Sequence, residues 1–164
     1  MANEIRITEK MRNQIGRDLP PWRYEVTTSS VRAFARGVGY TDPVYYDEEA
    51  AKAAGYRSLP APPTYLGTAI FIPGESSDTT SRPFAGEPSI DHGLDGQLDG
   101  GTETEYFGPV CAGDTLSVVS RITALEVRDS KALGKMLVMS SESTYVNEET
   151  GKRIALQRRQ WIFH

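Results

Sequence analysis

The sequence has few of the residues that hold metals or form disulfides. Cysteine occurs once, at Cys111, so no disulfide can form within the chain, and this favours a reducing compartment. Histidine occurs twice, at His92 and His164, and two histidines with one cysteine offer no zinc-binding spacing. We therefore expect no metal site.

The sequence also lacks long hydrophobic runs and clustered charge. No apolar stretch approaches the roughly 18 residues that a membrane-spanning helix needs, and the first charges are not followed by an apolar run of signal-peptide length. The formal net charge of -4 is spread along the chain, without the Lys/Arg stripe that tracks a phosphate backbone. We expect a cytoplasmic protein that binds neither membrane nor nucleic acid.

The length of 164 residues suits one domain with one core, spanning 1–164. Residues 1–24 are predicted to form an irregular N-terminal extension because they are polar and end in a Pro-Pro pair. Residues 73–101 are rich in Gly, Ser, Asp and Pro and are far longer than an ordinary connection. They are predicted to be a mobile flap or a functional loop.

The apolar pattern predicts three helices in the first half of the chain. One spans 29–38, with four apolar positions on one face and Thr28 as the expected N-cap. A second spans 48–54 after Asp47, another good N-cap. A third begins at Pro63 and is apolar on most sides through Phe71, so we expect it to be buried.

The last third of the chain is rich in β-branched and aromatic residues between turn signals. A short strand at 24–26 and four long strands at 102–107, 115–127, 137–146 and 153–163 are predicted, the last four as an antiparallel meander. Helices followed by antiparallel strands make an α+β domain, in which the apolar helix covers one face of the sheet. A sheet wrapped around a central apolar helix is the hot-dog arrangement.

Three stretches carry a resemblance to a known family. Residues 34–51 read FARGVGYTDPVYYDEEAA and resemble the hydratase motif of MaoC-like proteins, approximately F-A-x-x-S-G-D-x-N-P-I-H-x-D-x-x-x-A. Residues 54–65 look like its continuation in the N-terminal MaoC dehydratase subfamily, and 108–116, GPVCAGDTL, are similar to the family's R-P-L-x-x-G-D-T-L turn. The resemblance implies a hot-dog fold and an enoyl-CoA hydratase or 3-hydroxyacyl-thioester dehydratase, with a coenzyme A thioester as substrate and no further cofactor.

The chain departs from that motif where the chemistry is done. Active members hold and activate a water with the motif's Asp and His, whose positions fall here on Tyr40 and Tyr45, while the motif's Asn falls on Asp42. A phenol titrates near ~10, too high for a base at neutral pH. The resemblance therefore implies a degenerate half that shapes the acyl and coenzyme A site. A MaoC-like partner would supply Asp and His in a heterodimer or heterotetramer, and a homodimer is the alternative.

Asp42 and Tyr45 are the candidate catalytic residues, because they occupy motif positions with altered side chains. Asp42 either orients substrate or water, or holds the turn before a proline with its own carboxylate. Tyr40, a candidate substrate-binding residue, and Tyr45 either line the acyl pocket or pack the loop against a helix.

Pro62, Thr64 and His92 are further candidate substrate-binding residues. The first two precede the expected central helix, whose first amides can polarise a thioester carbonyl; Pro63 has no amide, so Thr64 is the nearest donor. The alternative is a rigid start to that helix. His92 follows Asp91 and forms either a relocated acid/base pair with it or a solvated part of the loop.

Three hypotheses about function follow. The chain is a subunit of an enoyl-thioester hydratase that works only with a partner, a binding or scaffold module without turnover, or a stand-alone hydratase that uses Asp42, Tyr45 or His92. A neighbouring reading frame that encodes a MaoC-like chain with an intact D-x-x-x-x-H motif would favour the first.

Overall fold

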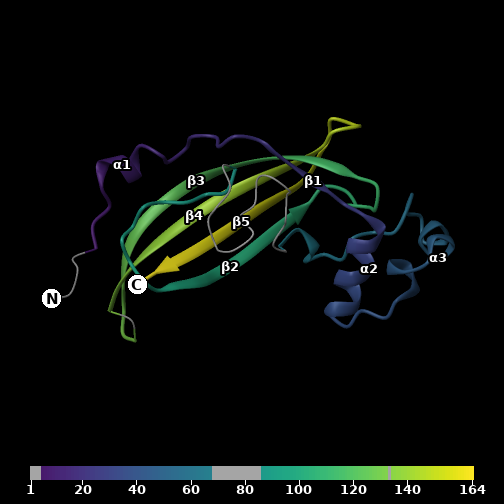
Figure 1. The fold of residues 1–164 in the computed structure, drawn as a ribbon, viewed down its shortest axis with the longest axis horizontal. Helices are drawn as coiled ribbons and strands as arrows, with labels where there is room; N and C mark the ends of the chain where they lie inside the picture. Colours follow the sequence, from purple (N-terminus) through teal and green to yellow (C-terminus); the bar gives the residue numbers. More distant parts are fainter. Residues whose placement is uncertain (1–4, 68–85, 133) are drawn as a thin grey trace.

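A five-stranded antiparallel sheet organises the computed structural model, which describes residues 5–67, 86–132 and 134–164. The strands are β1 (Trp22–Glu25), β2 (Gln97–Tyr106), β3 (Thr115–Ser130), β4 (Gly134–Asn147) and β5 (Arg153–Phe163). They lie in the order β1-β3-β4-β5-β2, and Figure 1 shows them as one curved layer. Together with the helices at one end of the sheet, this confirms the α+β class.

The predicted meander is correct for three strands and wrong for the fourth. β3, β4 and β5 follow one another as hairpins, but β2 pairs with β5 rather than with its neighbour in sequence, β3. The inner side of the sheet shows one reason, because buried Gln157 on β5 donates to Thr104 on β2 over 3.1 Å. Turn residues mark where strands end but do not state which strands pair.

The loop predicted for 73–101 is also corrected at its C-terminal end. Residues Gln97 to Gly101 belong to β2, with a β-bulge between Asp99 and Gly101. Gly101 has a φ of 120°, which only glycine adopts readily, so a Gly-rich sequence here belongs to a bulged strand. Residues 68–85 of the predicted loop and central helix lie outside the described residues; before them, Tyr65–Gly67 forms a short 3-10 helix, η2.

The helices follow their capping signals. α2 spans Thr28–Gly37, one residue earlier than predicted, because Thr27 rather than Thr28 is the N-cap and accepts from the Ser30 amide. α3 spans Glu48–Ala53, and its N-cap is Asp47 as predicted. A short helix that the sequence did not predict, α1 (Glu9–Arg12), interrupts the N-terminal extension after Thr8. Local side-chain hydrogen bonds explain all three starts.

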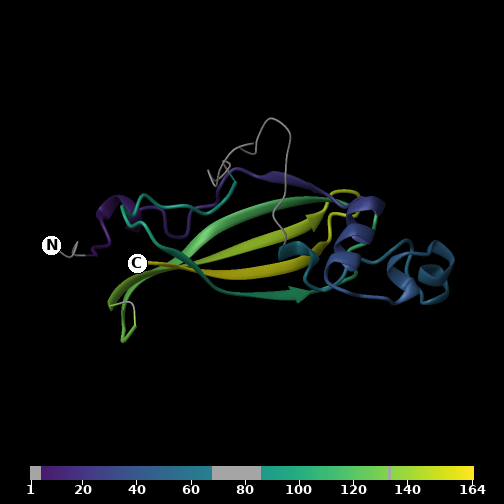
Figure 2. The ribbon, with the colours of Figure 1, turned by 60° about the horizontal axis from the view of Figure 1, so that its bottom comes forward.

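The core lies on the inner face of the sheet in two clusters. The larger one gathers β1, α2 and η2 around the Thr115 end of β3, and includes Tyr24, Val31, Leu66, Leu116, Val118 and Tyr145. The smaller one, at the other end, packs Met11 of α1 and Ile90 against Leu137 and Phe163. α2 and α3 therefore lie at one end of the sheet, and α1 and the C-terminus at the other (Figures 1 and 2).

Within the described ranges, no helix has both the length and the apolar character to cross a membrane.

Candidate functional site

The loop that carries the motif leaves α2 and returns through a single 3-10 turn, η1 (Pro43–Tyr45). Asp42 is the N-cap of this turn, and its Oδ1 accepts from the Val44 amide over 3.0 Å. Arg32 on α2 donates from Nε and Nη2 to the Tyr46 carbonyl at 3.0 and 2.7 Å. The loop is thus held by its own Asp42 carboxylate and by Arg32 of α2.

Tyr40 and Tyr45 face each other across this loop. Their rings are stacked, with centroids 5.5 Å apart and planes at 20°. Burial, followed by the nearby Tyr40 and Asp42, raises the pKa of the Tyr45 phenol above its ordinary value. The Tyr45 hydroxyl is therefore neutral at physiological pH and can donate a hydrogen bond but cannot remove a proton from water.

A cavity of about 570 Å³ opens beside Tyr45 and reaches the end of β2. Two further tyrosines line it, Tyr56 after α3 and Tyr106 on β2. The Tyr106 hydroxyl donates to the Pro63 carbonyl, and burial raises the pKa of this phenol to about 12. The other lining residues are Val44, Pro60, Ala61, Pro63, Phe107, Gly108, Pro109 and Val110.

This lining suits an apolar ligand. Among the described residues that form it, none carries a carboxylate, an imidazole or an amine, so the cavity holds apolar groups and offers phenolic donors. The sequence reasoning missed Tyr56 and Tyr106. Tyr106 lies near the end of a predicted strand, and only the structure shows that its side chain lines the cavity and reaches the Pro63 carbonyl.

The six predicted residues do not form one site. Tyr40, Asp42 and Tyr45 lie together, and of the six only Tyr45 lines the cavity. Pro62 is fully buried, and its carbonyl accepts from the Tyr65 amide at 2.9 Å; Thr64 is exposed in the turn before η2. Neither faces the cavity, and their predicted contact with substrate stays a prediction.

His92 lies at the far end of the sheet from the motif loop. Its ring stacks on Phe163 near the C-terminus, with centroids 4.0 Å apart, and its Nδ1 accepts from the Leu94 amide at 3.1 Å. Burial lowers the pKa of His92, against a smaller opposing effect of Asp91. His92 is therefore held as a neutral ring beside Phe163, the last residue of β5, and the C-terminus lies at the opposite end of the sheet from α2 and α3 (Figure 1).

The third family-like stretch, residues 108–116, forms a buried polar network at the start of β3. Asp114, whose side chain is 1% exposed, accepts from the Cys111 amide and the Asn147 side chain, each at 2.7 Å. Arg57, just after α3, also donates to it. The sequence predicted the turn, and the structure adds that Arg57 ties the segment after α3 to the sheet.

Comparison with known protein families gives one model match over most of the chain. The FAS1-like, dehydratase domain region model matches residues 13–157. A UPF0336 protein of Parafrankia sp. is 37% identical over 126 residues, which is 77% of each chain. A protein of Thermomonospora curvata described as a probable enoyl-CoA hydratase alpha subunit is 27% identical over 139 residues, covering 81% of this chain but 43% of that protein.

Solved structures give the same fold. The HadBC (3R-hydroxyacyl-ACP dehydratase) complex of Mycobacterium tuberculosis contains a chain that aligns with a TM-score of 0.66 at 18% identity, covering 91% of this chain and 96% of the other. The ChsH1-ChsH2 complex of the same organism contains one with a TM-score of 0.68 at 17% identity, with 89% and 88% covered.

Proposed function

The chain belongs to the FAS1-like dehydratase family and is a MaoC-like hot-dog protein, and from this premise we propose that it is the non-catalytic half of an enoyl-thioester hydratase. In this proposal the chain shapes the acyl and coenzyme A site. A MaoC-like partner supplies the Asp and His that add water to, or remove it from, the thioester. The hydro-lyase class itself is that of its relatives.

The observation that carries the proposal is the tyrosine stack. Tyr40 and Tyr45 stand at the motif positions for Asp and His. Their rings are stacked with centroids 5.5 Å apart, so two phenols occupy the place where an acid and a base would hold a water. The raised pKa of Tyr45 opposes a role as base. Asp42, which stands at the motif position for Asn, is engaged with the Val44 amide.

The cavity beside Tyr45 supports a role in binding. Its apolar and aromatic lining suits the alkyl chain of an acyl thioester, since burial of each CH₂ contributes about 0.8 kcal/mol. Tyr45 contributes a phenol without removing a proton. Coenzyme A enters this proposal as part of the substrate, and no other cofactor is required.

The relatives support a partner subunit. One is described as an alpha subunit, and two chains of similar fold come from complexes, HadBC and ChsH1-ChsH2. A half without an acid/base pair is useful only beside a half that has one. We therefore favour a heterodimer or heterotetramer over a homodimer.

Hydration assays test this proposal. Crotonyl-CoA and a long-chain trans-2-enoyl-CoA are followed by loss of enoyl absorbance, with the purified chain alone and then with a MaoC-like protein that has an intact D-x-x-x-x-H motif. We expect turnover in the mixture and none from this chain alone. As a matched control, the partner with its motif histidine replaced by alanine should give an inactive mixture.

Two other outcomes would contradict the proposal. Turnover by the chain alone would point to a stand-alone hydratase, and the variants Asp42→Asn, Tyr45→Phe and His92→Gln would then locate the altered mechanism. Tight binding of an acyl-CoA by the chain, without any gain in rate of the partner, would identify a binding module.

A further inference from the structure

The two edges of the sheet are unlike each other. β1 contributes only four residues to its edge, and the N-terminal segment continues along β3 through bridges at Ile15 and Asp18. At the other edge, β2 runs for ten residues and pairs on one side only, with β5, among the described residues. Its residues are almost all exposed. β2 is thus a long edge strand with free backbone donors and acceptors, which is a template for another strand.

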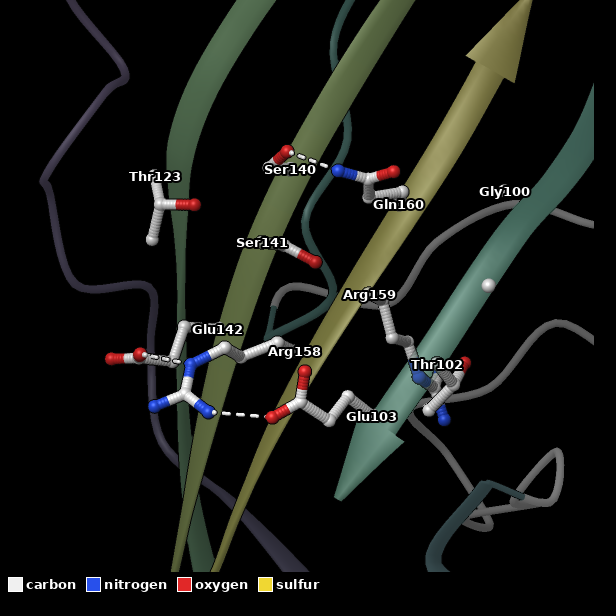
Figure 3. Close-up of a pocket in the computed structure, with 11 residues that line it drawn as sticks. Gly100, Thr102, Glu103, Thr123, Ser140, Ser141, Glu142, Arg158, Arg159 and Gln160 are labelled. Carbon is white, nitrogen blue, oxygen red and sulfur yellow. Dashed lines mark hydrogen bonds and ion pairs between the residues drawn. The ribbon is translucent and has the colours of Figure 1, made fainter. Parts of the chain in front are cut away.

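Charged side chains cross the outer face of the sheet in a row toward this edge. Asp18 lies 3.9 Å from Arg121 on β3, and Arg121 donates to Glu142 on β4 at 2.8 Å. Glu142 lies 3.6 Å from Arg158 on β5, which reaches Glu103 on β2 at 3.2 Å (Figure 3). The signs alternate from strand to strand along the whole row.

The row ends at the edge with an excess of negative charge. Glu105 on β2 lies 3.8 Å from the same Arg158, so Glu103 and Glu105 share a face and share one arginine, which also faces Glu142. Their side chains are 74% and 51% exposed. A further strand beside β2 would face these two carboxylates, and to continue the alternation it would have to carry cations opposite them.

This row discriminates between possible partners. In a two-fold pairing of β2 with a second copy of itself, centred anywhere from Glu103 to Glu105, glutamates of the two copies stand opposite each other. Directly opposed side chains in an antiparallel pair lie about 5 Å apart, and like charges there are destabilising. A strand with Lys or Arg at those positions would instead extend the alternation.

The outer face has room for such side chains. A hollow of about 630 Å³ lies beside the same edge and is lined by Glu103, Arg158, Gln160 and the two glycines of the bulge, Gly100 and Gly101. Because the glycines carry no side chain, the hollow reaches the edge strand itself (Figure 3).

We propose that Glu103 and Glu105 select the partner at the β2 edge: they disfavour pairing of the chain with itself and favour a non-identical subunit whose edge strand presents Lys or Arg opposite them. The inference rests on the proposed function, since it specifies the chemistry of the partner that function requires. It also explains how an incomplete half avoids forming an inactive homodimer.

A charge-swap experiment tests the edge without the natural partner. The double variant Glu103→Lys/Glu105→Lys is mixed with the unchanged chain, and association is measured by sedimentation velocity at low salt. Each opposed pair then changes from repulsive to attractive, so we expect the mixed dimer to form with a Kd roughly tenfold lower than either chain alone. High salt should weaken that preference.

The control carries the same change in charge elsewhere. In Glu126→Lys/Glu149→Lys both substitutions lie away from β2, and mixing it with the unchanged chain should give no preference for a mixed dimer. The milder variant Glu103→Gln/Glu105→Gln guards against misfolding, and it should associate with itself more tightly than the unchanged chain at low salt.

The inference would be overturned if the unchanged chain dimerised tightly at low salt and neither edge variant altered the Kd of self-association. So would equal association in the mixed and unmixed samples. Neither readout involves turnover, so a failed edge is distinguishable from a failed hydratase proposal.

Discussion

Asp114 and Asp42, each in one of the family-like stretches, have different surroundings. Asp114 is buried and accepts hydrogen bonds from Arg57, Cys111 and Asn147. Asp42 is exposed and accepts one hydrogen bond, from Val44 two residues ahead. The first joins three segments of the fold, whereas the second holds only its own turn. The buried network that builds the scaffold is therefore complete, while the loop between α2 and α3 presents two stacked tyrosines.

This difference separates the contacts that the proposed non-catalytic half must keep from those that it can lose. A subunit that only shapes a cavity needs the turn at Asp114, because that turn positions β3 and the segment after α3. It does not need an acid/base pair. The contrast between the two aspartates gives the predictions below.

The largest effect is expected from Asp114→Ala. The change removes a buried acceptor and leaves the Cys111 amide, the Asn147 side chain and the Arg57 guanidinium without it. We expect the free energy of unfolding to fall by about 3 kcal/mol or more. Urea denaturation followed by circular dichroism measures this. A loss below about 1 kcal/mol would mean that the network does not hold the scaffold.

Asp42→Ala is the matched substitution in the motif loop and should have a smaller effect. It removes one exposed cap, worth about 1 kcal/mol or less. With an active partner, kcat should stay within about threefold, since the proposed role of Asp42 is structural. A fall in kcat on the order of 100-fold at unchanged stability would assign proton transfer to Asp42 and contradict the contrast.

Tyr45→Phe should have the smallest effect, on the pH dependence of the complex. Burial raises the pKa of Tyr45 in the folded state, so folding favours the neutral phenol. The contribution of Tyr45 to the free energy of unfolding is therefore constant below the unfolded pKa of about 10 and decreases as the pH rises above it. Between pH 6 and about 9 the phenol does not titrate. The pH profile of kcat should therefore be unchanged, with Tyr56→Phe as control; loss of one limb would make Tyr45 a proton donor or acceptor.

Local signals in the sequence predicted local structure well. Asp47 and Gly55 bracket α3, and the turn at Gly113-Asp114 lies between β2 and β3, because these residues act on backbone within a few positions. The position of β2 beside β5 was not predictable in this way. It depends on contacts such as Gln157 with Thr104, which involve residues far apart in the chain.

The candidate site was predictable only in part, for the same reason. The motif spacing identified Tyr40 and Tyr45, and the structure stacks them. Tyr106 and Tyr56 were missed because no local pattern marks a side chain that lines a cavity from another element. His92 stood out because histidine is rare in the sequence and because Asp91 precedes it, but the ring it stacks on is that of Phe163, which no spacing rule would pair with it.

The strand order has a consequence for how the chain folds. β1 must wait for β3, since Trp22 pairs with Val118, and β2 must wait for β5, the strand that ends at Phe163. Contacts between such distant segments slow folding, because a long loop has to close before the pairing stabilises it. During synthesis the segments of α2 and α3 are made before either edge strand has its partner. A cut before Arg153 would therefore remove more than the last strand, because β2 would lose the neighbour it pairs with in the sheet.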